Sequence, residues 1–182
     1  LQNENKHLLG IFEELFGIIN QNKIVTFLRE TAFGSVNINQ YLEKRFVSYF
    51  KDISGVPIIV TKNDYKKNIF NGDIGILLID QSKVTNCVLK VSGKPKIFDI
   101  KTISDYEYAF AITVHKCQGS EYEDILLILP NDMDNRLLKK ELLYTGITRA
   151  KKSATICSTR DVLKKSITTK SERVSGFDFW NI

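Results

Sequence analysis

Two patterns of apolar and polar residues alternate along this chain. Near both ends, apolar residues recur at helical spacing or gather in short runs, whereas the middle holds only short β-rich runs. Residues 125–129 (ILLIL) are apolar throughout, which is typical of a buried parallel strand. Residues 111–115 form a second β-rich run, and a compact polar stretch separates the two. Helices mixed with buried strands predict an α/β layer at both ends of the chain.

The same patterns predict the remaining elements of this layer. Asn37 is expected to cap a helix that runs to about residue 50, with Gln40 completing a capping box. The other elements expected are helices over residues 5–19, 137–150 and 161–167, and strands over residues 23–28 and 153–158.

The middle of the chain predicts a different architecture. Four short β-rich runs cover residues 56–62, 74–79, 84–91 and 96–100, with turn residues between them. About fifty residues of short antiparallel strands suggest a small barrel of the SH3 kind. We therefore expect an inserted barrel over residues 55–104 in a discontinuous α/β domain made of residues 1–54 and 105–182.

The net positive charge of the chain indicates a candidate binding partner. The 182-residue chain has a net charge of +5, and residues 55–104 carry eight lysines against four aspartates, or +4 of that excess. A basic segment suggests a polyanion such as nucleic acid. The alternative is that lysines on exposed strands prevent edge-to-edge pairing. Charge alone leaves both interpretations open.

The amino-acid composition argues against several other classes of protein. The longest apolar run is far shorter than the roughly 20 residues that a membrane helix needs. Three widely spaced cysteines argue against a zinc site or a disulfide framework and suit a reducing cytoplasm. Two histidines are too few for a metal centre, so no metal ligand is predicted.

The polar stretch after residue 112 is the first candidate site. It brings a base, a cation, an amide, hydroxyls and a carboxylate close together in sequence, as Thr113, His115, Lys116, Gln118, Ser120 and Glu121. Ligands of open α/β sheets bind at the carboxyl ends of strands, where this loop is expected to lie. The alternative is an ordinary solvated loop.

The second candidate site is the segment YTGITRAKK, residues 144–152. It places Thr145, Thr148 and Arg149 on or near one face at the end of a helix. A guanidinium fits phosphate oxygens and can stabilise charge on a transferring phosphoryl group. The alternative is an arginine favoured by the helix dipole. Arg29, just past the strand over 23–28, is either another anion contact or a surface residue.

Together these segments resemble superfamily 1 helicases. TVHKCQGSEYE resembles motif V, YTGITRAKK motif VI and VTFLRETAFG motif IV, while GVPIIVTKNDYKKNIFNGDIGILL resembles the start of the barrel inserted in RecD-like helicases. The run FLRETAFGSVNINQYLEKRF and the tail SERVSGF are similar to the RecD family, the alpha subunits of exodeoxyribonuclease V. Cys117 departs from the serine or alanine usual in motif V.

The resemblance implies a fold and a role for each candidate residue. The fold is a RecA-like parallel-sheet domain (helicase domain 2A) with an inserted SH3-like barrel (2B). Arg149 would be the catalytic arginine finger, and Glu121, Gly119 and Arg29 would contact nucleotide. Single-stranded DNA would be bound by Thr113, His115 and Gln118, and by Lys116 unless that side chain points to solvent.

No G-x-x-x-x-G-K-[ST] phosphate loop occurs in the sequence. We therefore expect ATP and Mg²⁺ to be held mainly by another RecA-like domain, and this chain to be inactive as an ATPase by itself. The resemblance implies the C-terminal motor half of a 5′–3′ DNA helicase in the bacterial cytoplasm, acting with RecB- and RecC-type subunits in break repair and recombination. A stand-alone RecD-like helicase and a binding module without ATP chemistry are the alternatives. The barrel contacts either DNA or a partner subunit.

Overall fold

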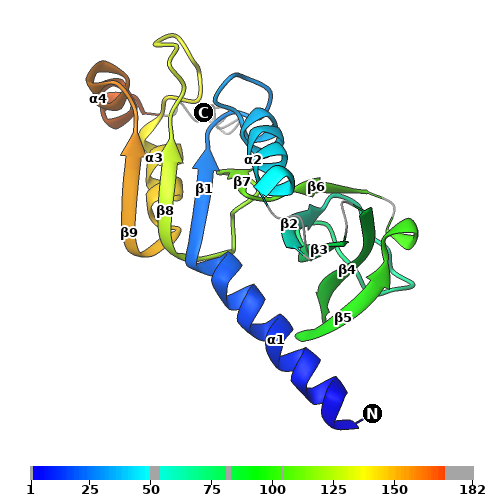
Figure 1. Ribbon diagram of the computed structural model, residues 1–182. Helices are drawn as coiled ribbons and strands as arrows, with labels where there is room; N and C mark the ends of the chain where they lie inside the picture. The colour runs from blue at the N-terminus through cyan, green and yellow to red at the C-terminus, as the bar shows by residue number, and fades with distance from the viewer. Residues whose placement is uncertain (1, 50–53, 81–82, 104, 171–182) are drawn as a thin grey trace, which may run out of the picture.

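Two β-sheets organise the molecule. The computed structural model describes residues 2–49, 54–80, 83–103 and 105–170. One sheet is parallel and four-stranded, and the other is antiparallel and five-stranded. A long helix, α1 (Gln2–Gln21), reaches from the amino end of the parallel sheet to the antiparallel one (Figure 1).

The parallel sheet has the strand order β7-β1-β8-β9. These strands are β1 (Asn22–Thr26), β7 (Ala111–Thr113), β8 (Tyr122–Ile128) and β9 (Ala150–Cys157). Their register aligns the last residues of all four strands, so the sheet has two distinct edges. We call the edge where the strands begin the amino edge, and the edge where they end the carboxyl edge.

Apolar burial on one face holds this sheet together. Val25 and Leu127 are fully buried in a core that also takes in Leu143 of α3 (Lys140–Ile147) and Val162 of α4 (Arg160–Thr168). The helix α2 (Ser35–Tyr49) lies beside β7 instead (Figure 1). The continuous apolar run at residues 125–129 falls on β8, a central strand of the sheet, as the sequence predicts. The run is not buried throughout, because Leu126 is 36% exposed.

The antiparallel sheet has the order β5-β4-β3-β2-β6. Its strands are β2 (Ser54–Val60), β3 (Ile74–Asp80), β4 (Lys83–Val91), β5 (Lys94–Asp99) and β6 (Tyr106–Tyr108), with the 3-10 helix Ile100–Thr102 before β6. The four predicted runs are all strands. The three-residue β6 was not predicted, and its pairing with β2 carries the sheet four residues past the expected boundary at residue 104. Barrel closure stays a prediction, because β5 and β6 are the outer strands in the described pairing.

Helix α1 joins the two sheets through its apolar face. Phe12 and Phe16 are buried against Ile76 of β3 and Val88 of β4. Lys90 adds an ion pair with Glu13, with 2.7 Å between Nζ and Oε2. The helical spacing of apolar residues predicted over 5–19 therefore serves a contact between the sheets.

The connection from β6 into β7 is fixed by polar groups from other elements. Asn39 of α2 is buried, and its amide donates to the carbonyls of Tyr108 and Ala111 at 2.6 and 2.8 Å while accepting from the Ala111 N–H. Lys23 donates to the Ala109 carbonyl at 2.8 Å. Burial lowers the pKa of the Lys23 ammonium to about 8. These bonds set where the following polar loop leaves the sheet.

Some predicted element boundaries are wrong. Helix α2 begins at Ser35, so Asn37 is not its cap and instead donates its side-chain N–H to the Thr31 carbonyl at 2.9 Å. Helix α3 begins at Lys140 because Lys139 is extended, with φ −128° and ψ 144°. Strand β9 begins at Ala150, three residues earlier than predicted. Among the described residues, no helix combines the length and apolar character needed to cross a membrane.

Candidate functional site: two edges of one sheet

The polar loop that follows β7 crosses from one edge of the sheet to the other. It leaves the carboxyl edge at Thr113, where the Val114 N–H still donates to the Thr26 carbonyl at 2.9 Å. It arrives at the amino edge, where Tyr122 begins β8. The strand β8 has seven residues, so the two edges lie about 20 Å apart. The expectation that the whole loop sits at the carboxyl edge is therefore wrong for its second half.

At the amino edge, Glu121 and Arg149 lie beside each other. They directly precede the neighbouring strands β8 and β9, and the Tyr122 N–H donates to the Arg149 carbonyl at 2.8 Å. The Arg149 guanidinium donates to the Ser120 carbonyl at 3.3 Å, the Thr145 carbonyl at 3.1 Å and the Thr148 hydroxyl at 3.3 Å. The helix end and the loop therefore hold this side chain half-buried at the edge. We refer to Gly119, Ser120, Glu121 and Arg149 as the amino-edge group.

Gly119 and Glu121 have different roles in this group: the first shapes the turn, and the second presents a polar side chain to solvent. Gly119 has φ +86° with open space around it, so the turn needs glycine for its backbone conformation and not for room. The Glu121 carboxylate is exposed and 3.7 Å from the Lys151 ammonium. It lines a polar hollow of about 680 Å³ together with Asn20 and Lys151. A carboxylate at a solvated hollow can accept hydrogen bonds from ligand hydroxyls.

At the carboxyl edge, a second group forms from three separate segments. Glu107 of β6 accepts from Arg29 at 3.0 Å and from Lys116 at 2.8 Å. Arg29, which also pairs with its neighbour Glu30, follows β1, whereas Lys116 follows β7. His115 is exposed beside Lys116. We refer to Arg29, Glu107, His115 and Lys116 as the carboxyl-edge group.

Arg29 and Arg149 therefore lie at opposite edges of the sheet. The sequence places both at strand ends, and resemblance assigned both to nucleotide. The parallel register puts Arg29 beyond the last residue of β1 and Arg149 before the first residue of β9. Their guanidinium groups share no partner in the described contacts, since Arg29 donates to Glu107 whereas Arg149 donates to the loop and helix end at the other edge. The geometry thus does not bring Arg29 into the amino-edge group.

The remaining loop residues have different exposures. Thr113 is buried, and its hydroxyl accepts from the Lys116 N–H at 3.4 Å, so it holds the turn and is not presented to solvent. Gln118 is exposed between the two groups. Cys117 is buried in the core, and burial raises the pKa of its thiol to about 11. The departure from the usual serine or alanine is therefore a packing position and supplies no nucleophile.

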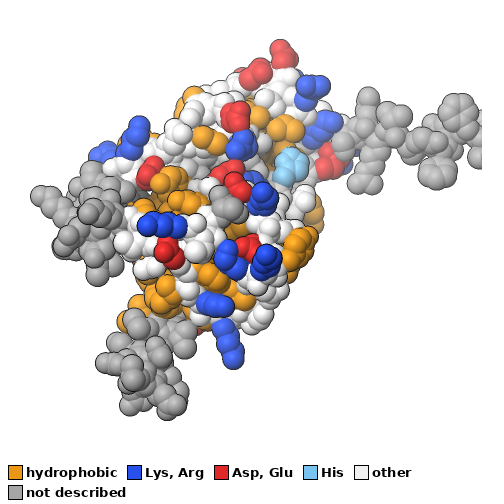
Figure 2. Space-filling model, turned by 90° about the vertical axis from the view of Figure 1, so that its right-hand side faces the viewer, with side chains coloured by type: hydrophobic (Ala, Val, Ile, Leu, Met, Phe, Trp, Pro, Cys, Tyr) orange, Lys and Arg blue, Asp and Glu red, His pale blue; other side chains and the backbone are white. Residues whose placement is uncertain are grey.

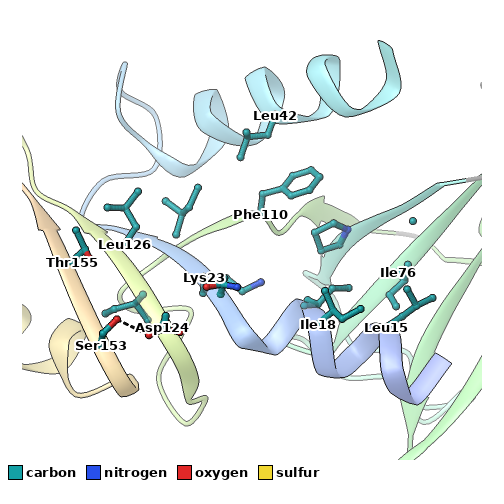
Figure 3. A pocket seen from close by; sticks show the side chains of 16 residues that line it. Leu15, Ile18, Lys23, Leu42, Ile76, Phe110, Asp124, Leu126, Ser153 and Thr155 are labelled. Carbon is teal, nitrogen blue, oxygen red and sulfur yellow. Dashed lines mark hydrogen bonds between the residues drawn. The ribbon is translucent and has the colours of Figure 1, made fainter. Parts of the chain in front are cut away.

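One apolar hollow lies outside both groups. It is an open trough of about 590 Å³ on the sheet face opposite α3, between α1 and α2 (Figure 3). Leu15, Leu42, Phe110 and Leu126 line it, while Asp124 and Ser153 share a hydrogen bond on its floor. None of the candidate residues named from the sequence lines it.

Sequence reasoning missed Glu107 and Asn39. Glu107 lies in a three-residue strand without a clear period, so nothing marked it as close to Lys116. Asn39 did leave a signal, because asparagine is unfavourable inside a helix unless its side chain has a specific partner. Both residues act through contacts distant in sequence, with 78 positions separating Arg29 from Glu107.

Comparison with known proteins defines the class. Residues 108–157 match the UvrD-like helicase C-terminal domain. The fold is similar to a Pif1 helicase from Bacteroides in complex with ADP-AlF3 and single-stranded DNA, with a TM-score of 0.51 and 16% identity over 83% of this chain and 43% of that one. The parallel sheet is thus part of a helicase-like, RecA-like fold.

Closer relatives identify the family. The RecBCD enzyme subunit RecD of Buchnera aphidicola is 34% identical over 85% of this chain and 28% of its own length. The RecD subunit of Mycobacterium tuberculosis is 34% identical over 93% of this chain and 30% of its own length. The ATP-dependent RecD2 DNA helicase of Deinococcus radiodurans is 27% identical over 71% of this chain and 19% of its own length. The chain belongs to the RecD family of helicases and spans less than a third of the length of these relatives.

Proposed function

We propose that this chain is the second motor half of an ATP-dependent DNA helicase, with nucleotide at the amino edge and single-stranded DNA at the carboxyl edge. One observation carries the proposal: the segment over residues 113–121 joins the two groups directly. A movement at Glu121 would reach Lys116 and His115 through only five or six residues of backbone. The two ligands of a motor must influence each other, and such a short connection provides a physical path.

At the amino edge, Arg149 is proposed as the arginine finger and Glu121 as a contact to the ribose. A guanidinium there could stabilise charge on a γ-phosphate held by a facing domain. Its present partners at Ser120 and Thr148 are 3.3 Å away, so a phosphate would compete with weak bonds.

The cofactors proposed are ATP and Mg²⁺. Residues of this chain suit some groups of the nucleotide but not the metal ion. Arg149 and Glu121 suit a phosphate and a ribose hydroxyl. Over the described ranges, no group of three His, Cys, Asp or Glu side chains could hold a metal ion. When bound, ATP supplies the phosphoryl group whose hydrolysis drives movement. We propose that the phosphate loop and the Mg²⁺ ligands belong to another RecA-like domain, and that this chain alone does not turn over ATP.

At the carboxyl edge, His115, Lys116 and Gln118 are proposed to contact the DNA backbone. We add Arg29 to this surface and not to the nucleotide, because it shares the edge with Lys116. Cationic and polar groups position a strand without reading its sequence. Figure 2 shows that lysine and arginine side chains are interleaved with acidic ones on the face that includes the antiparallel sheet, so no single basic stripe covers it.

The setting is also proposed from the family. A RecBCD-type complex with RecB- and RecC-type subunits, 5′–3′ movement and a role in double-strand break repair fit the RecD relatives. A stand-alone RecD-like helicase is the alternative setting. Within this setting, the parallel sheet would belong to RecA-like domain 2, and the antiparallel sheet, from β2 to β6, would be its inserted SH3-like module. Free cysteines at positions 87, 117 and 157 suit a reducing bacterial cytoplasm.

Binding of this chain to a fluorescent single-stranded oligonucleotide tests the DNA surface. We expect affinity to fall as salt rises, with a log–log slope of about −0.7 for each phosphate contact. Replacing Lys116 by alanine should weaken binding and make the slope shallower by about that amount. Lys152→Ala at the amino edge is the matched control and should leave the slope unchanged. Binding that does not depend on salt, or equal effects of the two substitutions, would remove this surface from the proposal.

A further inference from the structure

A single carboxylate lies between the two cations of the carboxyl-edge group. Glu107 Oε1 is 3.0 Å from Arg29 Nη2, and Glu107 Oε2 is 2.8 Å from Lys116 Nζ. The two cations come from the ends of different strands and share no other acceptor with each other in the described contacts. Each carboxylate oxygen of Glu107 thus forms an ion pair with one of the two cations.

The carboxylate is held in this place by the fold. Glu107 pairs with Ile59 across β6 and β2, so the antiparallel sheet carries it to the edge of the parallel one. The next residue, Tyr108, donates its hydroxyl to Glu43 of α2 at 2.6 Å and its carbonyl accepts from Asn39. The side chain therefore belongs to a strand that is bonded to both β2 and α2, while the cations belong to loops.

Glu107 is ionised at neutral pH. Partial burial by itself would raise the pKa of this carboxyl group, but hydrogen bonds from Lys116 and Arg29 outweigh burial and hold the pKa below its ordinary value. The charge between the cations is therefore a full negative one.

We propose that Glu107 occupies the position of a nucleic-acid phosphate and competes with DNA for Arg29 and Lys116. This inference rests on the proposed function of the carboxyl edge and deepens it. A carboxylate and a phosphodiester accept the same charge-assisted hydrogen bonds, so the two anions exclude each other at these donors. A strand that binds must displace Glu107 or share its cations.

Competition of this kind lowers affinity without abolishing it. About a third of the Glu107 and Lys116 side chains and half of the Arg29 side chain are exposed, with values of 33%, 31% and 49%. Ion pairs at such positions are weak and can be exchanged for another anion. A motor that steps along DNA has to release each phosphate, and an internal anion that recaptures the cations favours release.

The test compares Glu107→Gln with Glu123→Gln in the binding assay with single-stranded DNA. Glu123 is a matched control, because its side chain is 34% exposed and pairs with Lys152 at 2.9 Å, but at the amino edge. We expect Glu107→Gln to tighten binding about three- to tenfold at low salt and to steepen the salt slope by about 0.7 for each freed cation. Glu123→Gln should change affinity by less than twofold, although both substitutions remove one negative charge.

Adding Lys116→Ala separates competition from an indirect effect. The gain from Glu107→Gln should shrink when Lys116 is already absent, since one of the two freed cations is missing. If the wild-type chain binds DNA and Glu107→Gln binds equally or more weakly, Glu107 orients the cations and does not compete, and this inference alone fails. If neither protein binds DNA, the proposed function of the carboxyl edge fails together with it.

Discussion

Replacing Arg149 by alanine is expected to lower ATP turnover of the full-length protein about 10³-fold or more while single-stranded DNA affinity changes less than threefold. An arginine that stabilises a transferring phosphoryl group contributes rate enhancements of this size. The DNA surface should be spared because the carboxyl-edge group lies about 20 Å away across β8. The measurement is steady-state ATP hydrolysis alongside oligonucleotide binding.

Two further variants make this result interpretable. Arg149→Lys keeps the charge but loses the forked donors, so it should recover only a small part of the turnover. Arg136→Ala removes an exposed arginine from the loop before α3 and should leave turnover unchanged. A turnover in Arg149→Ala within tenfold of the wild type would show that the guanidinium is structural, as its bonds to Ser120 and Thr145 would then suggest.

Replacing Gly34 by alanine is expected to destabilise the fold by about 2–3 kcal/mol and to weaken DNA binding. A Cβ at this position would lie 2.4 Å from the Arg29 carbonyl oxygen and 2.7 Å from the Thr31 nitrogen. Both are backbone atoms, so the turn that carries Arg29 must move. The same turn supplies carbonyls to the start of α2, where the Val36 N–H donates to Arg29 at 3.1 Å. Thermal or denaturant unfolding measures the loss of stability.

Gly17→Ala is the matched control for this substitution. Gly17 lies in α1, is exposed, and has no atom within 4 Å of an added Cβ. Alanine should raise stability there by up to about 1 kcal/mol, because glycine is a poor helix former. If the two glycine substitutions have the same effect, close packing of the turn at Gly34 is not what holds Arg29.

The sequence predicts the elements of this fold better than their placement. Apolar runs identify β8 and the strands β2, β3 and β4 because burial imposes a clear pattern. Strand β6 escapes because three partly buried residues carry no period. The cap at Asn37 fails because a side chain that could cap a helix bonds to the preceding turn instead.

The candidate site shows where a linear motif misleads. Residues from Thr113 to Glu121 read as one polar loop, yet they end at opposite edges of a sheet. The separation follows from the parallel direction of β7 and β8, because a segment that joins two parallel strands has to return from the carboxyl edge to the amino edge. Arg29 was assigned to nucleotide by the resemblance to motif IV, and its place beside Lys116 at the carboxyl edge is why we propose it as a DNA contact instead.

Photo-crosslinking of the full-length protein tests the division between the two edges most directly. A photoreactive ATP analogue and a photoreactive single strand would be cross-linked in separate samples, and labelled residues mapped by mass spectrometry. We predict nucleotide labels at or beside Glu121 and Arg149, and DNA labels at or beside Arg29, His115 and Lys116. Both labels on the same edge, or DNA labels at Arg149 with nucleotide labels at Lys116, would contradict the account.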